Sequence, residues 1–175
     1  MIIIITGATH TGKTLLSQKL IDKFRYPCLS IDHLKMGLIR AGCTELTPED
    51  DRELTGYLFP IVKEMIRTAI ENGQNMIVEG CYIPFDFRSL LGKEYAEHVK
   101  FLCLALSDKY IDGHFGDIVR FESVTEKRIV DPCLTPEFCK RENRFYEKGF
   151  REKGERVELI EDDFEAELLR IVEAL

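Results

Sequence analysis

The chain has 175 residues, of which 45% are hydrophobic and 31% charged, so it is long enough and apolar enough to bury a core as one domain. Its net charge of −7 argues against non-specific binding to nucleic acid, which depends on a surplus of Lys and Arg over the phosphate backbone. Because no apolar run approaches the roughly 18 residues of a membrane span, we expect a cytoplasmic protein with no signal peptide and no transmembrane helix.

The first predicted elements are a strand and a helix joined by a glycine-containing loop. Residues 2–6 form a continuous β-branched run without polar alternation, which is typical of a strand buried on both faces of a parallel sheet. From residue 13 to residue 25 the apolar positions recur at helical spacing, as in Leu16, Leu20, Ile21 and Phe24. The predicted order is therefore strand, glycine loop, helix.

A second strand and two helices are predicted next. Residues 28–31 form a short strand candidate, and Asp32 follows it directly, where its carboxylate can cap the next helix. The pair Thr47-Pro48 predicts the start of a longer helix, with Thr47 as its cap, that extends to about residue 73. Pro60 lies inside this helix and lacks an N–H, so we expect it to kink or split the helix.

Three more strands and a last helix complete the pattern. The strands are predicted at residues 75–79, 98–106 and 157–160. The last helix carries its apolar side chains on one side, namely Phe164, Leu168, Ile171, Val172 and Leu175. Strands that alternate with helices along the whole chain predict a three-layer α/β/α domain.

The loop between the first strand and the first helix carries the most specific motif in the sequence. It matches the Walker A pattern Gly-x-x-x-x-Gly-Lys-Thr through Gly7, Ala8, Thr9, His10, Thr11, Gly12, Lys13 and Thr14. Glycines let the backbone turn its N–H groups inward, and the N-terminus of the following helix adds positive potential. We therefore predict binding of ATP with Mg²⁺, in which Lys13 reaches the β and γ phosphates and Thr14 offers its hydroxyl to the metal.

With this motif, the chain resembles the P-loop kinases of the adenylate-kinase-like group, which includes nucleoside monophosphate, shikimate and gluconate kinases and the zeta-toxin family. The run Ile77-Val78-Glu79-Gly80, followed by Pro84 and Arg88, is similar to the end of that family's third strand. Glu79 stands where an aspartate is more usual, and the spacing to Arg88 is longer. The resemblance implies an indirect role for Glu79 in binding Mg²⁺ and makes Arg88 a clamp on an anionic acceptor. The alternatives are a strand-end acid and a solvated arginine.

Asp32 is the candidate for binding the acceptor or taking its proton. Several kinases of the resembled group place an aspartate at the end of the second strand, and a carboxylate beside the γ-phosphate can orient a hydroxyl and accept its proton. The alternative is a plain helix cap. Lys35 and Arg40, on the predicted helix that follows, are further candidate contacts to the acceptor.

Arginines after the fourth strand are candidates for stabilising the transferring phosphoryl group. A first basic cluster, Arg120, Lys127 and Arg128, precedes Asp131-Pro132. The segment from Arg128 resembles the short lid of shikimate-type kinases, with Asp131 in place of an arginine. A second basic cluster lies on one predicted helix at Lys140, Arg141, Arg144 and Lys148. Either cluster can instead be a solvated helix face.

The sequence thus predicts a P-loop NTPase fold with a five-stranded parallel sheet in strand order 2-3-1-4-5. One domain spans residues 1–175, with an acceptor-binding helical region at about 33–72 and a lid-like region at about 110–153. The predicted function is ATP- and Mg²⁺-dependent transfer of the γ-phosphoryl group to a small-molecule hydroxyl or phosphate. A P-loop nucleotide-binding regulator, or a partner-dependent ATPase without such an acceptor, remains the alternative. We expect no nucleic-acid or membrane partner.

Overall fold

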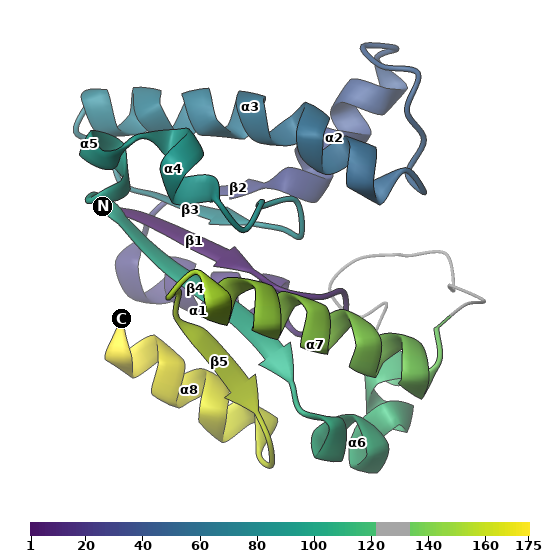
Figure 1. Ribbon diagram of the computed structural model, residues 1–175. Helices are drawn as coiled ribbons and strands as arrows, with labels where there is room; N and C mark the ends of the chain where they lie inside the picture. The colour runs from purple at the N-terminus through teal and green to yellow at the C-terminus, as the bar shows by residue number, and fades with distance from the viewer. Residues whose placement is uncertain (122–133) are drawn as a thin grey trace.

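A parallel β-sheet forms the centre of the computed structural model, which describes residues 1–121 and 134–175 (Figure 1). Its strand order is β2-β3-β1-β4-β5, and every neighbouring pair is parallel. This confirms the predicted order and the α/β/α class. The strands are β1 (Ile2–Thr6), β2 (Cys28–Ser30), β3 (Met76–Glu79), β4 (Val99–Leu106) and β5 (Val157–Ile160).

The isoleucines of β1 show why this strand lies in the middle of the sheet. All four are 0% exposed, as the unbroken apolar run predicts. Ile2 and Ile4 face one core, while Ile3 and Ile5 face the other, because successive side chains in a strand point to opposite faces. Two apolar layers therefore cover the sheet, and the carboxyl ends of its strands meet at one edge.

Helices supply both layers. On one face α3 lies over the sheet with α2 and α4, and on the other α1 packs with α8 (Figure 1). The α-helices are α1 (Lys13–Phe24), α2 (Ile31–Arg40), α3 (Asp51–Glu71), α4 (Phe87–Leu91), α5 (Lys93–Ala96), α6 (Asp108–Phe121), α7 (Pro136–Glu152) and α8 (Phe164–Ala174). Within the described ranges, no helix combines the length and the apolar character needed to cross a bilayer.

Two predicted helix starts are wrong. Ser30 is the N-cap of α2, so Asp32 lies in its first helical turn rather than at the cap. The helix begins early because Ile31 is 0% exposed and packs beside Gly80, where an added Cβ would lie 2.8 Å from the Ile31 Cβ. The helix α3 begins at Asp51 instead of after Thr47, because the Thr47 amide and hydroxyl donate to Asp50 Oδ2 over 2.7 and 2.8 Å and hold a turn there.

Pro60 does not split α3, which is one helix of 21 residues. The side chains before and after the proline, Leu58, Phe59 and Val62, are buried in the core beneath the helix. Burial of this continuous face compensates for the backbone hydrogen bond that a proline cannot donate.

Candidate active site

The Gly7–Thr14 loop, here the phosphate loop, is closely packed against its surroundings. Gly7 has a φ of 140°, and a Cβ added to it would lie 2.0 Å from the carbonyl oxygen of Leu104 on β4. Gly12 has a φ of 87°, and its added Cβ would lie 2.4 Å from Cζ of Phe164 on α8. Both positions require glycine, because of their conformation and because of the lack of space.

The interior of the phosphate loop holds a buried cation. Lys13 is only 7% exposed, and its Nζ donates to the carbonyl oxygen of Ala8 over 2.6 Å. The Thr11 hydroxyl donates to the same oxygen over 3.0 Å. A buried ammonium at the N-terminus of α1, within a loop of glycines, suits an anionic ligand such as the phosphates of ATP.

Oxygen-bearing side chains gather at the neighbouring strand ends. Glu79 ends β3, is 3% exposed, and lies in register with Ile5 on β1 and Ser30 on β2. Among the described residues, the buried hydroxyls of Thr6 and Ser30 have no hydrogen-bond partner. Such hydroxyls are common where water or an ion binds. With Thr14 in the first turn of α1, these groups match the oxygen ligands and bound waters that Mg²⁺ prefers.

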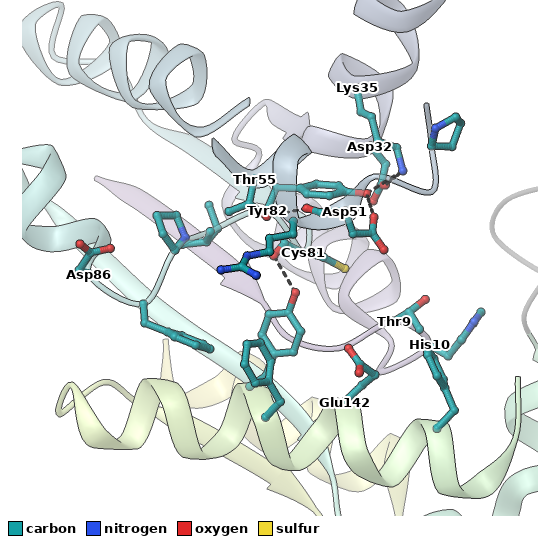
Figure 2. A pocket seen from close by; sticks show the side chains of 18 of the residues that line it. Thr9, His10, Asp32, Lys35, Asp51, Thr55, Cys81, Tyr82, Asp86 and Glu142 are labelled. Carbon is teal, nitrogen blue, oxygen red and sulfur yellow. Dashed lines mark hydrogen bonds and ion pairs between the residues drawn. The ribbon is translucent and has the colours of Figure 1, made fainter. Parts of the chain in front are cut away.

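A cavity of about 1120 Å³ opens beside the phosphate loop. Thr9 and His10 form part of its lining, so the loop and the cavity share residues (Figure 2). Its other walls come from α2, α3, the segment that follows β3, and α7. The cavity thus lies at the carboxyl edge of the sheet, where ligands bind in open α/β folds.

A hydrogen-bonded chain of four side chains forms the polar wall of the cavity (Figure 2). The Lys35 ammonium lies 3.2 Å from Asp32 Oδ1 and donates to the Tyr82 hydroxyl over 2.8 Å. The Tyr82 hydroxyl in turn donates to Asp51 Oδ1 over 2.8 Å. Burial, and next the charge of Asp51, raise the pKa of Tyr82, so this phenol keeps its proton. These hydrogen-bonded side chains connect α2 and α3 to the segment that follows β3.

The structure brings some of the predicted site residues together and separates others. Asp32 and Lys35 line the same cavity as Thr9 and His10. Arg40 is exposed at the end of α2 and lies outside the lining. Arg88 also lies outside it, pairing with Glu155 and donating to the Ala96 carbonyl over 3.0 Å. The proposed roles of Arg40 and Arg88 stay predictions.

The predicted lid residues are only partly described. Arg120 lies in the last turn of α6, and Arg128 and Asp131 lie outside the described residues. The second basic cluster lies on α7 as predicted. Each of its cations has a carboxylate neighbour: Lys140 has Asp112, Arg141 has Glu142, Arg144 has Asp108 and Lys148 has Glu152.

Three features of the site were missed by the sequence reasoning. They are Asp51, Tyr82 and the aromatic residues on α7. Tyr82 follows the Glu79-Gly80 pair closely, which is a usable signal for a residue at the strand edge. On α7, Phe138, Glu142 and Tyr146 recur at intervals of four and line the cavity, which a helical pattern could have shown.

Comparison with known proteins finds solved structures whose fold is similar to that of this chain. No family model matches the chain, and no curated protein matches it in sequence. Among solved structures, deoxyadenosine kinase from M. mycoides with bound dATP is similar, with a TM-score of 0.56 and 13% identity over 99% of this chain and 98% of that one. Shikimate kinase from Aquifex aeolicus has a TM-score of 0.53 and 12% identity, over 99% and 95%. Shikimate kinase from Bacteroides thetaiotaomicron has a TM-score of 0.56 and 14% identity, over 99% and 97%.

The chain has the fold of the P-loop small-molecule kinases. In this P-loop kinase fold, β1, the glycine loop and α1 form one continuous unit, as they do here. The identities are low, so the likeness extends to the fold and leaves the acceptor to be inferred from the cavity.

Proposed function

We propose that this chain is an ATP- and Mg²⁺-dependent phosphotransferase that moves the γ-phosphoryl group to a small-molecule hydroxyl or phosphate. The observation that carries the proposal is the shared lining: the phosphate loop contributes Thr9 and His10 to a cavity that also contains the Asp32 carboxylate. A triphosphate held by the loop would therefore direct its terminal phosphate toward a cavity that has room for an acceptor.

The phosphate loop would bind the nucleotide. Its backbone N–H groups and the Lys13 ammonium would contact the phosphates, with Lys13 leaving the Ala8 carbonyl to do so. Thr14 and Glu79, with intervening waters, would hold the metal. When bound, Mg²⁺-ATP supplies the transferable phosphoryl group and the ADP leaving group.

Asp32 would act on the acceptor. Its carboxylate is 23% exposed, so it remains accessible from the cavity, and Lys35 at 3.2 Å holds it in place. A carboxylate so placed can orient a hydroxyl and take its proton as the new P–O bond forms. The helical region at about 33–72, which includes most of α2 and all of α3, would then bind the rest of the acceptor. The lid-like role of the region at about 110–153 stays a prediction, and within that region α7 is fixed to β4 through the buried Asn143.

A screen for acceptor-stimulated ADP release tests the proposal. Nucleotides, nucleosides, sugars and hydroxy acids are offered to the parent protein with Mg²⁺-ATP. We expect Lys13→Ala to lower turnover at least about a hundredfold, because it removes a charge from the transferring phosphates. Asp32→Asn should lower kcat by about 10²-fold or more while Mg²⁺-ATP binding persists.

Matched variants control for the loss of charge itself. Lys93→Ala removes an exposed ammonium on α5 and outside the cavity lining, and Asp22→Asn removes an exposed carboxylate on α1. Both should behave like the parent. ADP release that no compound stimulates, and that Asp32→Asn leaves unchanged, would instead favour an ATPase or a nucleotide-binding regulator.

A further inference from the structure

Three aromatic side chains form a continuous surface on the side of the cavity nearest α7. Phe85, Phe145 and Tyr146, here the aromatic wall, all line the cavity. The Phe85 ring centroid lies 5.1 Å from that of Phe145 and 6.3 Å from that of Tyr146. Phe145 and Tyr146 are 5.6 Å apart and nearly perpendicular, at 88°. Phe145 nevertheless remains 56% exposed, so a large apolar ring faces solvent beside the cavity.

Within the aromatic wall, the ring of Phe85 is held in place before any ligand binds. The ring of Phe85 occupies the space over Gly149, where an added Cβ would lie 2.3 Å from the Phe85 Cζ. Phe85 also contacts the fully buried ring of Phe150 edge-on, with 4.8 Å between the ring centroids. Rings fixed in this way lose little conformational freedom when a ligand packs against them.

The wall offers ring surface rather than hydrogen bonds. Phe85 and Phe145 have no polar atoms in their side chains, and the Tyr146 hydroxyl already donates to the carbonyl oxygen of Cys81 over 3.0 Å. Burial is the main cause that raises the pKa of Tyr146, so its phenol stays protonated and bonded to that carbonyl. A ligand would therefore meet this wall by stacking and apolar contact.

The charges around the cavity favour an acceptor without strong negative charge. Four acidic residues line it and outnumber three basic ones: Asp32, Asp51, Asp86 and Glu142 against Lys35, Arg52 and Lys153. Lys35 is already paired with Asp32. The lining therefore offers no excess of positive charge to attract an acceptor with several anionic groups.

We infer that the acceptor carries a planar, uncharged ring joined to a hydroxyl-bearing group. The ring packs on the aromatic wall, and the hydroxyl faces Asp32 on the polar wall, in the cavity that Thr9 and His10 of the phosphate loop also line. The cavity of about 1120 Å³ is larger than a ring-free hydroxy acid of a few heavy atoms would fill. This inference rests on the proposed function, since it assigns the acceptor of that reaction.

Comparing alcohols that carry a ring with alcohols that lack one tests the inference. Purine and pyrimidine nucleosides are compared with ribose, and pyridine alcohols with glycerol, in the ADP-release measurement with Mg²⁺-ATP. Ring-bearing compounds should stimulate turnover and their ring-free counterparts should not. Phe145→Ala should raise the acceptor KM about tenfold with kcat within about twofold, because one stacking surface is lost. Phe145→Tyr should restore the parent KM.

The same variants are examined without nucleotide by saturation-transfer NMR on the ring protons of the probes. Phe145 is exposed, so its truncation should leave the fold intact, and Leu169→Ala removes a side chain of similar exposure, 51%, on α8 outside the cavity lining as a control. Saturation transfer to the ring protons should occur with the parent and with Leu169→Ala. The affinity for the ring-bearing probes should fall about tenfold in Phe145→Ala.

The outcomes separate the inference from the proposed function. Ring-dependent binding that Phe145→Ala weakens, without any transfer, would support the ring site and contradict the phosphotransferase. Equal use of ribose or glycerol, with a KM that Phe145→Ala does not change, would overturn the inference and leave the phosphotransferase standing. Weakened Mg²⁺-ATP binding in Phe145→Ala would assign the aromatic wall to the nucleotide and also overturn it. The absence of both turnover and ring-proton saturation transfer would also overturn the inference that the acceptor carries a ring.

Discussion

Gly7 joins β1 to the phosphate loop at a point where backbone from two strands meets. Its φ of 140° and the 2.0 Å approach of an added Cβ to the Leu104 carbonyl leave no room for a side chain. We predict that Gly7→Ala destabilises the protein by more than about 3 kcal/mol, because backbone must shift to admit the methyl group. Denaturant unfolding measures this cost.

Gly37 provides the control for that substitution. It lies within α2, and an added Cβ would meet nothing within 4 Å. Gly37→Ala should therefore stabilise the protein by about 0.5–1 kcal/mol through helix propensity. If both substitutions had the same sign and size, the close packing of the phosphate loop against β4 would be contradicted.

Tyr82 connects three parts of the polar wall through one hydroxyl group. We predict that Tyr82→Phe costs about 1–2 kcal/mol of stability, because the Asp51 carboxylate and the Lys35 ammonium each lose a buried partner. The free energy of unfolding measures the change. Tyr95→Phe is the matched control, because that hydroxyl bonds Glu71 at the surface, and it should leave the denaturation midpoint unchanged. Equal effects of the two variants would argue against a cooperative polar wall.

At the scale of elements, α7 is anchored to the sheet by a buried asparagine. Asn143 is 2% exposed, and its Oδ1 accepts from the Leu106 amide at the end of β4 over 2.7 Å. Its Nδ2 donates to the Cys139 carbonyl over 2.8 Å. The anchor sets the position of the helix that carries Phe145 and Tyr146.

We predict that Asn143→Ala destabilises the protein by roughly 2–3 kcal/mol, because the Leu106 amide is left buried without its acceptor. It should also raise the KM for the acceptor, since the aromatic wall moves with α7. Thermal and denaturant unfolding give the first quantity, and acceptor titration gives the second. Lys148→Ala, on the exposed side of the same helix, should change neither. A stable Asn143→Ala variant with an unchanged KM would contradict the anchoring role.

Across the whole molecule, features set by a short stretch of sequence could be predicted. Features that depend on contacts between residues far apart in the sequence could not. The unbroken isoleucines of β1 were enough to predict the sheet's centre, and the spacing of Gly7, Gly12 and Lys13 was enough to predict a glycine loop between β1 and α1. The pairing of Arg88 with Glu155 could not be predicted, because Glu155 lies 67 positions away, where no local pattern points to it. Asp32 was placed at a cap because the burial of Ile31, which starts α2 early, depends on tertiary packing.

Ligand binding should stabilise the whole fold, because the phosphate loop contacts both β4 and α8. Mg²⁺-ATP at about a hundred times its Kd should add about 2.7 kcal/mol of stability. For a chain of this length, that corresponds to a rise in Tm of roughly 5–10 °C. A thermal melt measures the shift, which Lys13→Ala should remove and Lys93→Ala should retain. A parent protein whose Tm does not respond to Mg²⁺-ATP would contradict the nucleotide site.

Phosphorus NMR of the complete reaction tests the central claim most directly. The protein is incubated with Mg²⁺-ATP and the panel of ring-bearing and ring-free alcohols, and the fate of the γ-phosphorus is followed. Transfer to an acceptor predicts a new phosphoester resonance that grows as ADP forms, is lost in Lys13→Ala, and slows by about 10²-fold or more in Asp32→Asn. Formation of ADP with inorganic phosphate alone, at a rate that no acceptor changes, would contradict the claim.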